Sequence, residues 1–201
     1  LGAPRSANAT APIVIADPDY NLTVHGGAAG DGLAAEATQE APAERSRELQ
    51  RAGLSFAALP GTRVEGALVA ELLHATSYLG SAAVERTLKQ CRSPRILHIA
   101  THGFFLPDRP AAAPTENGAP PRRLHGRLAN PMLRSGLALA GANTWLADGP
   151  LPEGAEDALL NGEDVSGLDL MATELVVLSA CESGLGAVQA GEGVYGLRRA
   201  F

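Results

Sequence analysis

Two residues of this sequence, His102 and Cys181, have the types and surroundings of a catalytic pair. Cys181 follows an apolar run, residues 175–178, that is typical of a strand buried on both faces, and glycines come soon after it. His102 ends a similar predicted strand, 95–102, and Gly103 follows it. A thiol at the mouth of a buried strand can act as a nucleophile, and a neighbouring histidine can polarise the thiol or protonate a leaving amine.

The elements around this pair predict an α/β fold. Hydrophobic periodicity predicts strands at residues 12–17, 75–79, 95–102 and 175–181, and helices at residues 63–74 and 81–89. Such alternation favours a parallel or mostly parallel sheet with helices on its faces. Because the carboxyl ends of parallel strands share one edge of the sheet, His102 and Cys181 face each other there if their strands are neighbours.

Both predicted helices carry apolar residues at helical spacing. In the first helix these residues are Val64, Ala67, Leu68, Leu72 and Leu73, the pattern of a helix that packs one face against a core. The second helix is predicted to be capped by Ser81 and to turn Val84 and Leu88 inward.

Backbone amides beside the pair can complete a site for acyl transfer. The amide of Gly103 lies just past the histidine, with no side chain in the way. Together with the amide of Cys181 it can hold an oxyanion, for which two convergent N–H donors are the usual arrangement.

Each of these residues also has a purely structural explanation. A buried cysteine at a strand end is usually a small hydrophobic residue. His98 is expected to be a packed, hydrogen-bonded core histidine, and nothing near Cys91 activates its thiol. The order of the pair is more informative, because a histidine upstream of an Ala-Cys pair matches neither a nucleophile elbow nor the papain arrangement and fits a caspase-like one.

Composition excludes several other classes. The 201 residues suffice for one domain, and a net charge of −6 argues against nucleic-acid binding. No apolar stretch is long enough to span a membrane. Two cysteines form no disulfide framework, so a reducing, cytoplasmic location is expected. No ligand cluster for a metal is present, and the glycines of residues 26–32 do not follow a strand as a dinucleotide site requires, so no metal and no cofactor are expected.

The chain divides into a short tail or linker at residues 1–11 and one domain at residues 12–201. Loop insertions are predicted at 21–45 and 106–129, where Gly, Ala and Pro interrupt the periodicity. The chain lacks a starting Met and stops within a helix predicted from residue 191. We therefore expect a piece of a longer protein, incomplete at its C-terminal end.

Several motifs of the sequence closely resemble the CHAT domain, a branch of the caspase and separase group of cysteine peptidases. The matching stretches are Ile96 to Phe105, Asn130 to Gly141, Glu174 to Gly186, Gly191 to Leu197, and the openings at residues 13–19 and 59–62. The resemblance implies a caspase-like three-layer α/β sandwich with a mostly parallel sheet. It also implies peptide hydrolysis through a thioester on Cys181, with His102 as general acid and base and the Gly103 and Cys181 amides as the oxyanion hole. Upstream TPR repeats are a further implied feature.

Substrate preference is less constrained. Relatives that cut after basic residues line the first pocket with carboxylates, and the candidates here are Asp17, Asp19, Asp164 and Glu182. The alternative is that Asp17 and Asp19 are turn residues and Glu182 a solvated loop residue.

Two functions remain open from the sequence. The first is a cysteine endopeptidase that acts on a protein or peptide substrate. The second is a non-catalytic or partner-regulated interaction module that keeps the same fold. The reactivity of Cys181 distinguishes them.

Overall fold

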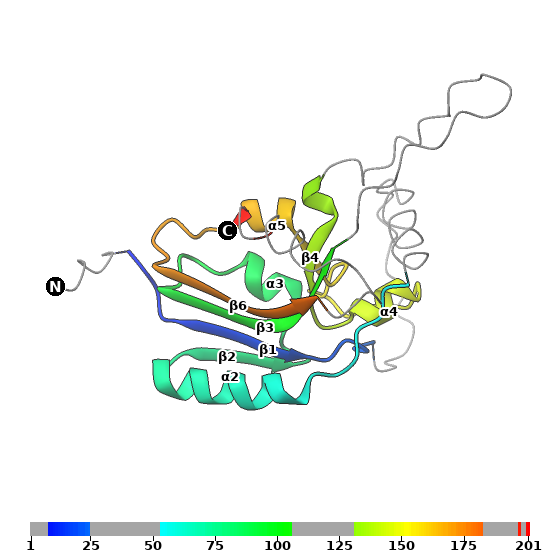
Figure 1. Cartoon of the computed structure of the whole chain (residues 1–201), viewed down its shortest axis with the longest axis horizontal. Coiled ribbons are helices and arrows are strands. Elements are labelled where there is room, and N and C mark those ends of the chain that lie inside the picture. The colour runs from blue at the N-terminus through cyan, green and yellow to red at the C-terminus, as the bar shows by residue number, and fades with distance from the viewer. Residues whose placement is uncertain (1–7, 25–52, 106–130, 183–196, 198–199) are drawn as a thin grey trace, which may run out of the picture.

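The computed structural model describes residues 8–24, 53–105, 131–182, 197 and 200–201 (Figure 1). Most of the insertion predicted at 21–45, all of the one at 106–129, and most of the helix predicted from residue 191 lie outside these residues. In the part that the structure describes, no helix is long and apolar enough to cross a membrane.

The described chain forms one six-stranded sheet. Its strands are β1 (Ile13–Pro18), β2 (Thr76–Gly80), β3 (Ile96–Phe105), β4 (Ser135–Ala138), β5 (Leu159–Asn161) and β6 (Leu175–Glu182). β1 pairs in parallel with β2 and β3, and β3 pairs in parallel with β6. β4 pairs antiparallel with both β3 and β5. The predicted α/β class with a mostly parallel sheet is confirmed, and the antiparallel pairing of β4 with β3 and β5 was not predicted.

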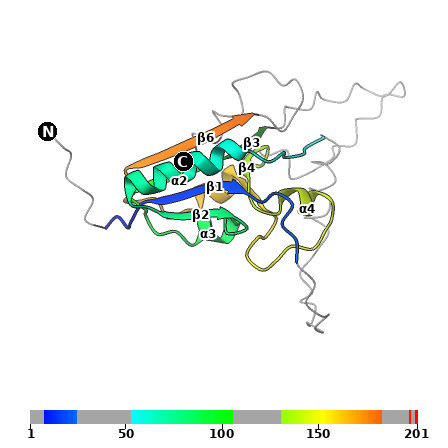
Figure 2. The same ribbon diagram turned by 90° about the horizontal axis from the view of Figure 1, so that it is seen from below.

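Helices pack against both faces of this sheet. They are α2 (Pro60–Leu73), α3 (Glu85–Lys89), α4 (Ala142–Leu146) and α5 (Gly162–Ser166), with a 3₁₀ turn at Pro131–Leu133. α2 lies along one face, as the view from below shows (Figure 2). Leu88 of α3 and Val165 of α5 pack on the other face. α3 begins at Glu85, and its N-cap residue is Val84, whose side chain makes no capping hydrogen bond. The predicted N-cap at Ser81 is therefore wrong.

The side of α2 that contacts the sheet differs from the predicted one. Val64, Leu68 and Leu72 are 61%, 55% and 80% exposed. The sheet side carries Gly66 instead, where an added Cβ would lie 2.5 Å from the Cβ of Ala16. Since Val64 and Leu68 lie two positions from Gly66, they stand about 200° from it around the helix. Small residues let the helix lie close to β1, and the larger apolar side chains therefore point outward.

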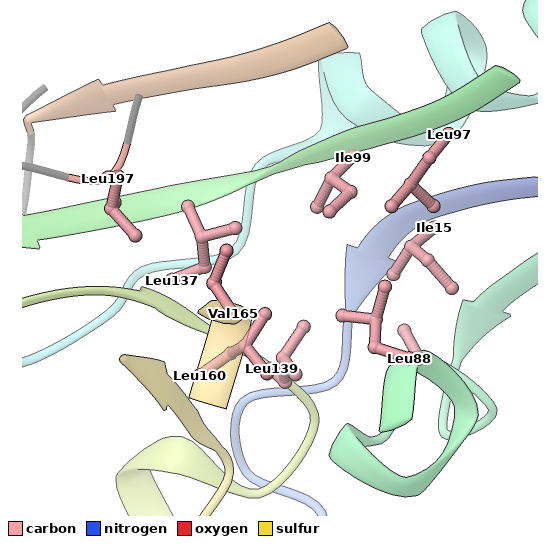
Figure 3. Close-up of a cluster of buried hydrophobic side chains, with 10 residues drawn as sticks. Ile15, Leu88, Leu97, Ile99, Leu137, Leu139, Leu160, Val165 and Leu197 are labelled. Carbon is pink, nitrogen blue, oxygen red and sulfur yellow. The ribbon is translucent and has the colours of Figure 1, made fainter. Parts of the chain in front are cut away.

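The main core lies on the face opposite α2. Ile15, Leu97 and Ile99 are fully buried there against the side chains of α3, β4, β5 and α5 (Figure 3). Side chains alternate along a strand, so His98 and His102 stand on the α2 side of β3. β3 is therefore buried on both faces, as its apolar sequence predicted.

A charged cluster sits beside this core. Glu85 is 1% exposed, and its Oε1 lies 2.7 Å from Nζ of Lys89. The same ammonium contacts Glu156 at 2.7 Å and Asp164 at 3.4 Å. Burial and the nearby charge of Asp157 raise the pKa of Glu85 to about 8, and Lys89 only partly opposes them. One lysine thus faces several carboxylates, and Glu85 is the member that remains protonated.

We expect Glu85→Gln to flatten the pH dependence of stability. The carboxyl of Glu85 ionises near pH 4.5 in the unfolded chain and only near pH 8 in the folded protein. Between these values the folded state binds more protons, so this group lowers stability as pH rises, by up to about 1.4 kcal/mol per pH unit. Urea unfolding at pH 5, 6.5 and 8 measures the effect, with exposed Glu71→Gln as the control. Parallel curves for wild type and Glu85→Gln would contradict it.

Candidate active site

His102 lies where β3 changes partners. Along one edge of β3 the last pair with β1 is Ala16 with Ala100, and the first pair with β4 is Leu137 with Gly103. β3 therefore continues to Phe105, and the prediction that the strand ends at His102 is wrong. Crevices at such changes of neighbour are where α/β sheets place their sites.

Tyr20 bridges this interval between β1 and β4. The backbone N–H of His102 donates to the Tyr20 hydroxyl oxygen at 3.3 Å, and that hydroxyl lies 2.9 Å from Oγ1 of Thr101. The Thr101 hydroxyl donates to the carbonyl of Ala138, so Tyr20 must donate to Thr101. Burial raises the pKa of the Tyr20 phenol, which keeps this donor protonated. On this edge of β3 no strand pairs with His102, and the Tyr20 side chain accepts its backbone N–H instead.

The imidazole of His102 is held in one orientation. Its Nε2 lies 2.8 Å from the carbonyl oxygen of Ala57, and the residue is 3% exposed. The rings of Tyr20 and Phe56 pack against it, with centroids 5.3 and 5.7 Å away. A carbonyl can only accept, so Nε2 carries the proton and Nδ1 is the acceptor in the neutral ring.

Asn143 at the start of α4 fixes the segment that supplies this carbonyl. Its side-chain amide accepts from the backbone N–H of Phe56 at 3.0 Å and donates to the backbone carbonyl of Phe56 at 2.9 Å. The same amide donates to Asn21, and the Asn143 backbone N–H donates to the carbonyl of Tyr20. Two segments distant in the sequence are thereby joined next to His102.

The register of the sheet brings Cys181 beside His102. β3 and β6 are adjacent parallel strands (Figure 1). The Cα positions of His102 and Cys181 are direct partners in this pair. Gly103 is likewise the partner of Glu182. Neighbouring strands lie about 4.8 Å apart, and register partners in a parallel pair share one face of the sheet. The condition that the sequence left open, whether the two strands are neighbours, is therefore met.

The space around Gly103 would admit a side chain. An added Cβ would meet Ala180 at 3.7 Å and the carbonyl of Gly136 at 3.9 Å, both ordinary contact distances. Ala180 packs with the core on the face opposite α2. The chemical contribution expected of Gly103 thus rests on its backbone amide, which any residue would supply.

The carboxylates considered for substrate binding have different surroundings. Asp17 forms an ion pair with Arg63 at 2.7 Å, and Asp19 accepts the backbone N–H of Asn21 in a turn. Asp164, in the first turn of α5, accepts the backbone N–H of the N-cap residue Asn161, on the core face of the sheet and away from the face of His102. The side chain of Glu182 lies outside the described part of the structure.

The other histidine and cysteine considered from the sequence, His98 and Cys91, are both buried. His98 is buried, as predicted, with Nε2 3.1 Å from a carboxylate oxygen of Glu65. Cys91 is buried, and burial raises the pKa of its thiol. Among the residues that the structure describes, no group of three or more His, Cys, Asp or Glu is arranged to hold a metal ion.

Sequence reasoning missed the residues that support His102. Ala57, Tyr20, Phe56 and Asn143 carry no motif that marks them, and Ala57 acts through its backbone. The only available signal was the Leu-Pro-Gly-Thr segment at 59–62, which indicated where a helix begins close to this carbonyl.

Comparison with protein families identifies one to which this sequence is similar. The sequence model of a protein family described as the CHAT domain matches residues 2–201. No curated protein and no solved structure matches the chain.

Proposed function

Because the chain belongs to the CHAT domain family, we propose that it is a cysteine endopeptidase with a caspase-like three-layer fold. The observation that supports this proposal most is the pairing of His102 with Cys181 in adjacent parallel strands. Its second support is the contact between Nε2 of His102 and the Ala57 carbonyl, which leaves Nδ1 as the base.

In this proposal the thiol of Cys181 is the nucleophile. His102 takes its proton, and the sulfur attacks the carbonyl carbon of the scissile peptide bond. The resulting oxyanion accepts hydrogen bonds from the backbone amides of Gly103 and Cys181. Gly103 pairs with Glu182, the residue after Cys181, so the two amides come from neighbouring positions of adjacent strands. This placement is compatible with both amides donating to one oxygen.

The second half of the reaction returns the enzyme to its starting state. The C–N bond breaks as protonated His102 gives its proton to the leaving amine, and a thioester remains on Cys181. His102 then deprotonates a water molecule that attacks the thioester. The carboxyl product leaves, and the thiol regains its proton.

We further propose that the first substrate pocket is acidic and favours a basic residue. Asp17 already pairs with Arg63, and Asp164 lies on the core face of the sheet, where it shares Lys89 with Glu156. Asp19 and Glu182 are the better candidates. Asp19 is exposed just beyond β1, and Glu182 follows Cys181 directly.

Labelling with reactive peptides tests this function. Three peptidyl acyloxymethyl ketones, with Arg, Asp or Leu next to the reactive group, would be incubated with the full chain and the adduct located by mass spectrometry. We expect one adduct on Cys181, fastest with Arg, and none in His102→Ala. The buried Cys91 serves as an internal control and should remain unmodified.

A folded chain whose Cys181 reacts with none of the three probes would contradict the peptidase and favour a non-catalytic interaction module. Equal rates for Arg, Asp and Leu would contradict only the acidic pocket.

A further inference from the structure

Glu65 of α2 contacts both strands that carry the proposed catalytic pair. Its Oε2 accepts a hydrogen bond from the Ser179 hydroxyl of β6 at 3.1 Å. Its Oε1 lies 3.1 Å from Nε2 of His98 in β3, a close approach that is not aligned as a hydrogen bond. One carboxylate therefore bridges β3 and β6.

This bridge lies on the face of the sheet that carries His102 and Cys181. Ser179 precedes Cys181 by two positions, and His98 precedes His102 by four, so alternation places all four on one side. The register partner of Ser179 is Ala100, which lies between the two histidines on β3. At Ser179 the bridge thus lies two residues before the catalytic pair along the strands.

On the opposite face of the sheet, Val176, Leu178 and Ala180 of β6 pack against the main core, and on the α2 face the described polar contact of β6 is the one made by Ser179. Within the described sheet β6 pairs only with β3, and Leu175 at its start is 51% exposed. Residues 175–180 include one polar side chain, that of Ser179. Along that stretch, a hydrogen bond from a side chain of β6 can therefore come only from this hydroxyl.

The helix that carries Glu65 is itself firmly placed. The neighbouring residue, Gly66, packs closely against Ala16 of β1. At 100° per residue, Glu65 leaves the helix to one side of this contact, and it reaches β3 and β6. A displacement of β6 relative to β3 would separate Ser179 from a carboxylate that α2 holds still.

We propose that Glu65 is a positioning residue for Cys181, because its carboxylate holds β6 in register with β3 through Ser179. This role rests on the proposed peptidase function. Glu65 acts through the strand and touches neither the substrate nor the reacting atoms. Its effect should therefore appear in the rate of reaction at Cys181 and leave substrate binding almost unchanged.

Two matched pairs of variants test the role in the full chain. Glu65→Ala and Ser179→Ala remove the bond, whereas Glu65→Gln and Ser179→Thr keep an acceptor oxygen and a hydroxyl. We expect each alanine variant to lower kcat on a cleaved fluorogenic peptide roughly tenfold, with KM unchanged within about twofold. The conservative variants should recover most of the loss, and Glu65→Ala/Ser179→Ala should be no worse than either single variant.

A second measurement does not depend on peptidase activity. Iodoacetamide alkylation of Cys181, followed by mass spectrometry against pH, reports the reactivity of the thiol itself. We expect the alanine variants to show a slower plateau rate or a shifted pH profile, and Glu71→Ala, an exposed change on the same helix, to show neither. Urea unfolding identifies any variant that has simply lost its fold.

Each other outcome would overturn the role. An unchanged kcat and alkylation profile in folded Glu65→Ala would exclude positioning while leaving the peptidase intact. A raised KM confined to basic peptides would make Glu65 a substrate contact instead. If the wild-type chain cleaves no peptide, the peptidase fails, and the alkylation profiles of the variants still decide the role of Glu65.

Discussion

Replacing Cys181 by alanine should lower kcat/KM on a cleaved peptide by on the order of 10⁴-fold or more, as expected when a covalent nucleophile is removed. Alanine keeps β6 apolar at this position and retains the backbone amide proposed for the oxyanion hole. The fold and the second oxyanion donor should therefore survive the change. Initial rates on peptides selected from a fluorogenic library, measured for wild type and variant, provide the test.

The matched control for this variant is Cys91→Ala. Cys91 is buried at the end of α3, outside the face of His102, and its loss should leave kcat/KM within about twofold because it removes no group of the site. Cleavage that persists in Cys181→Ala at more than a few per cent of the wild-type rate would exclude the proposed nucleophile.

Phe56→Ala should lower the free energy of unfolding by about 3–5 kcal/mol, the usual cost of removing a buried phenylalanine. Phe56 is 2% exposed and packs against Tyr20, His102 and Phe104. Domains of this size are stable by about 5–15 kcal/mol, so the loss is a large share of the total. Urea unfolding followed by circular dichroism measures it.

Phe56→Ala should also impair the site in the molecules that stay folded. The side chain supports the His102 ring, and the backbone of Phe56 precedes the Ala57 carbonyl that holds Nε2. Alkylation of Cys181 at low denaturant should therefore be slower than in wild type.

Leu72→Ala is the control for size and apolarity. Leu72 is 80% exposed, so the change should alter stability by less than about 0.5 kcal/mol. A loss comparable to that of Phe56→Ala would contradict the orientation of α2 and restore the face predicted from periodicity alone.

Much of the fold could be predicted because it depends on local patterns. Apolar runs marked β1, β3 and β6, and alternation with helices indicated a mostly parallel sheet. β5 has three residues and α4 has five, which is too short for a periodic signal to emerge. Periodicity located α2 but chose the wrong face, because it could not register that Gly66 and not a leucine contacts β1.

The sequence by itself determined that a histidine and a cysteine each lie near the carboxyl end of a buried strand, since strand periodicity and the glycines that follow are local features. Only the tertiary structure decided that these strands are neighbours and that His102 and Cys181 are register partners. It also decided how His102 is held, by Ala57, 45 positions away, and by Tyr20, 82 positions away. Such contacts depend on which segments the packed core brings together, and no local pattern of residues encodes that choice.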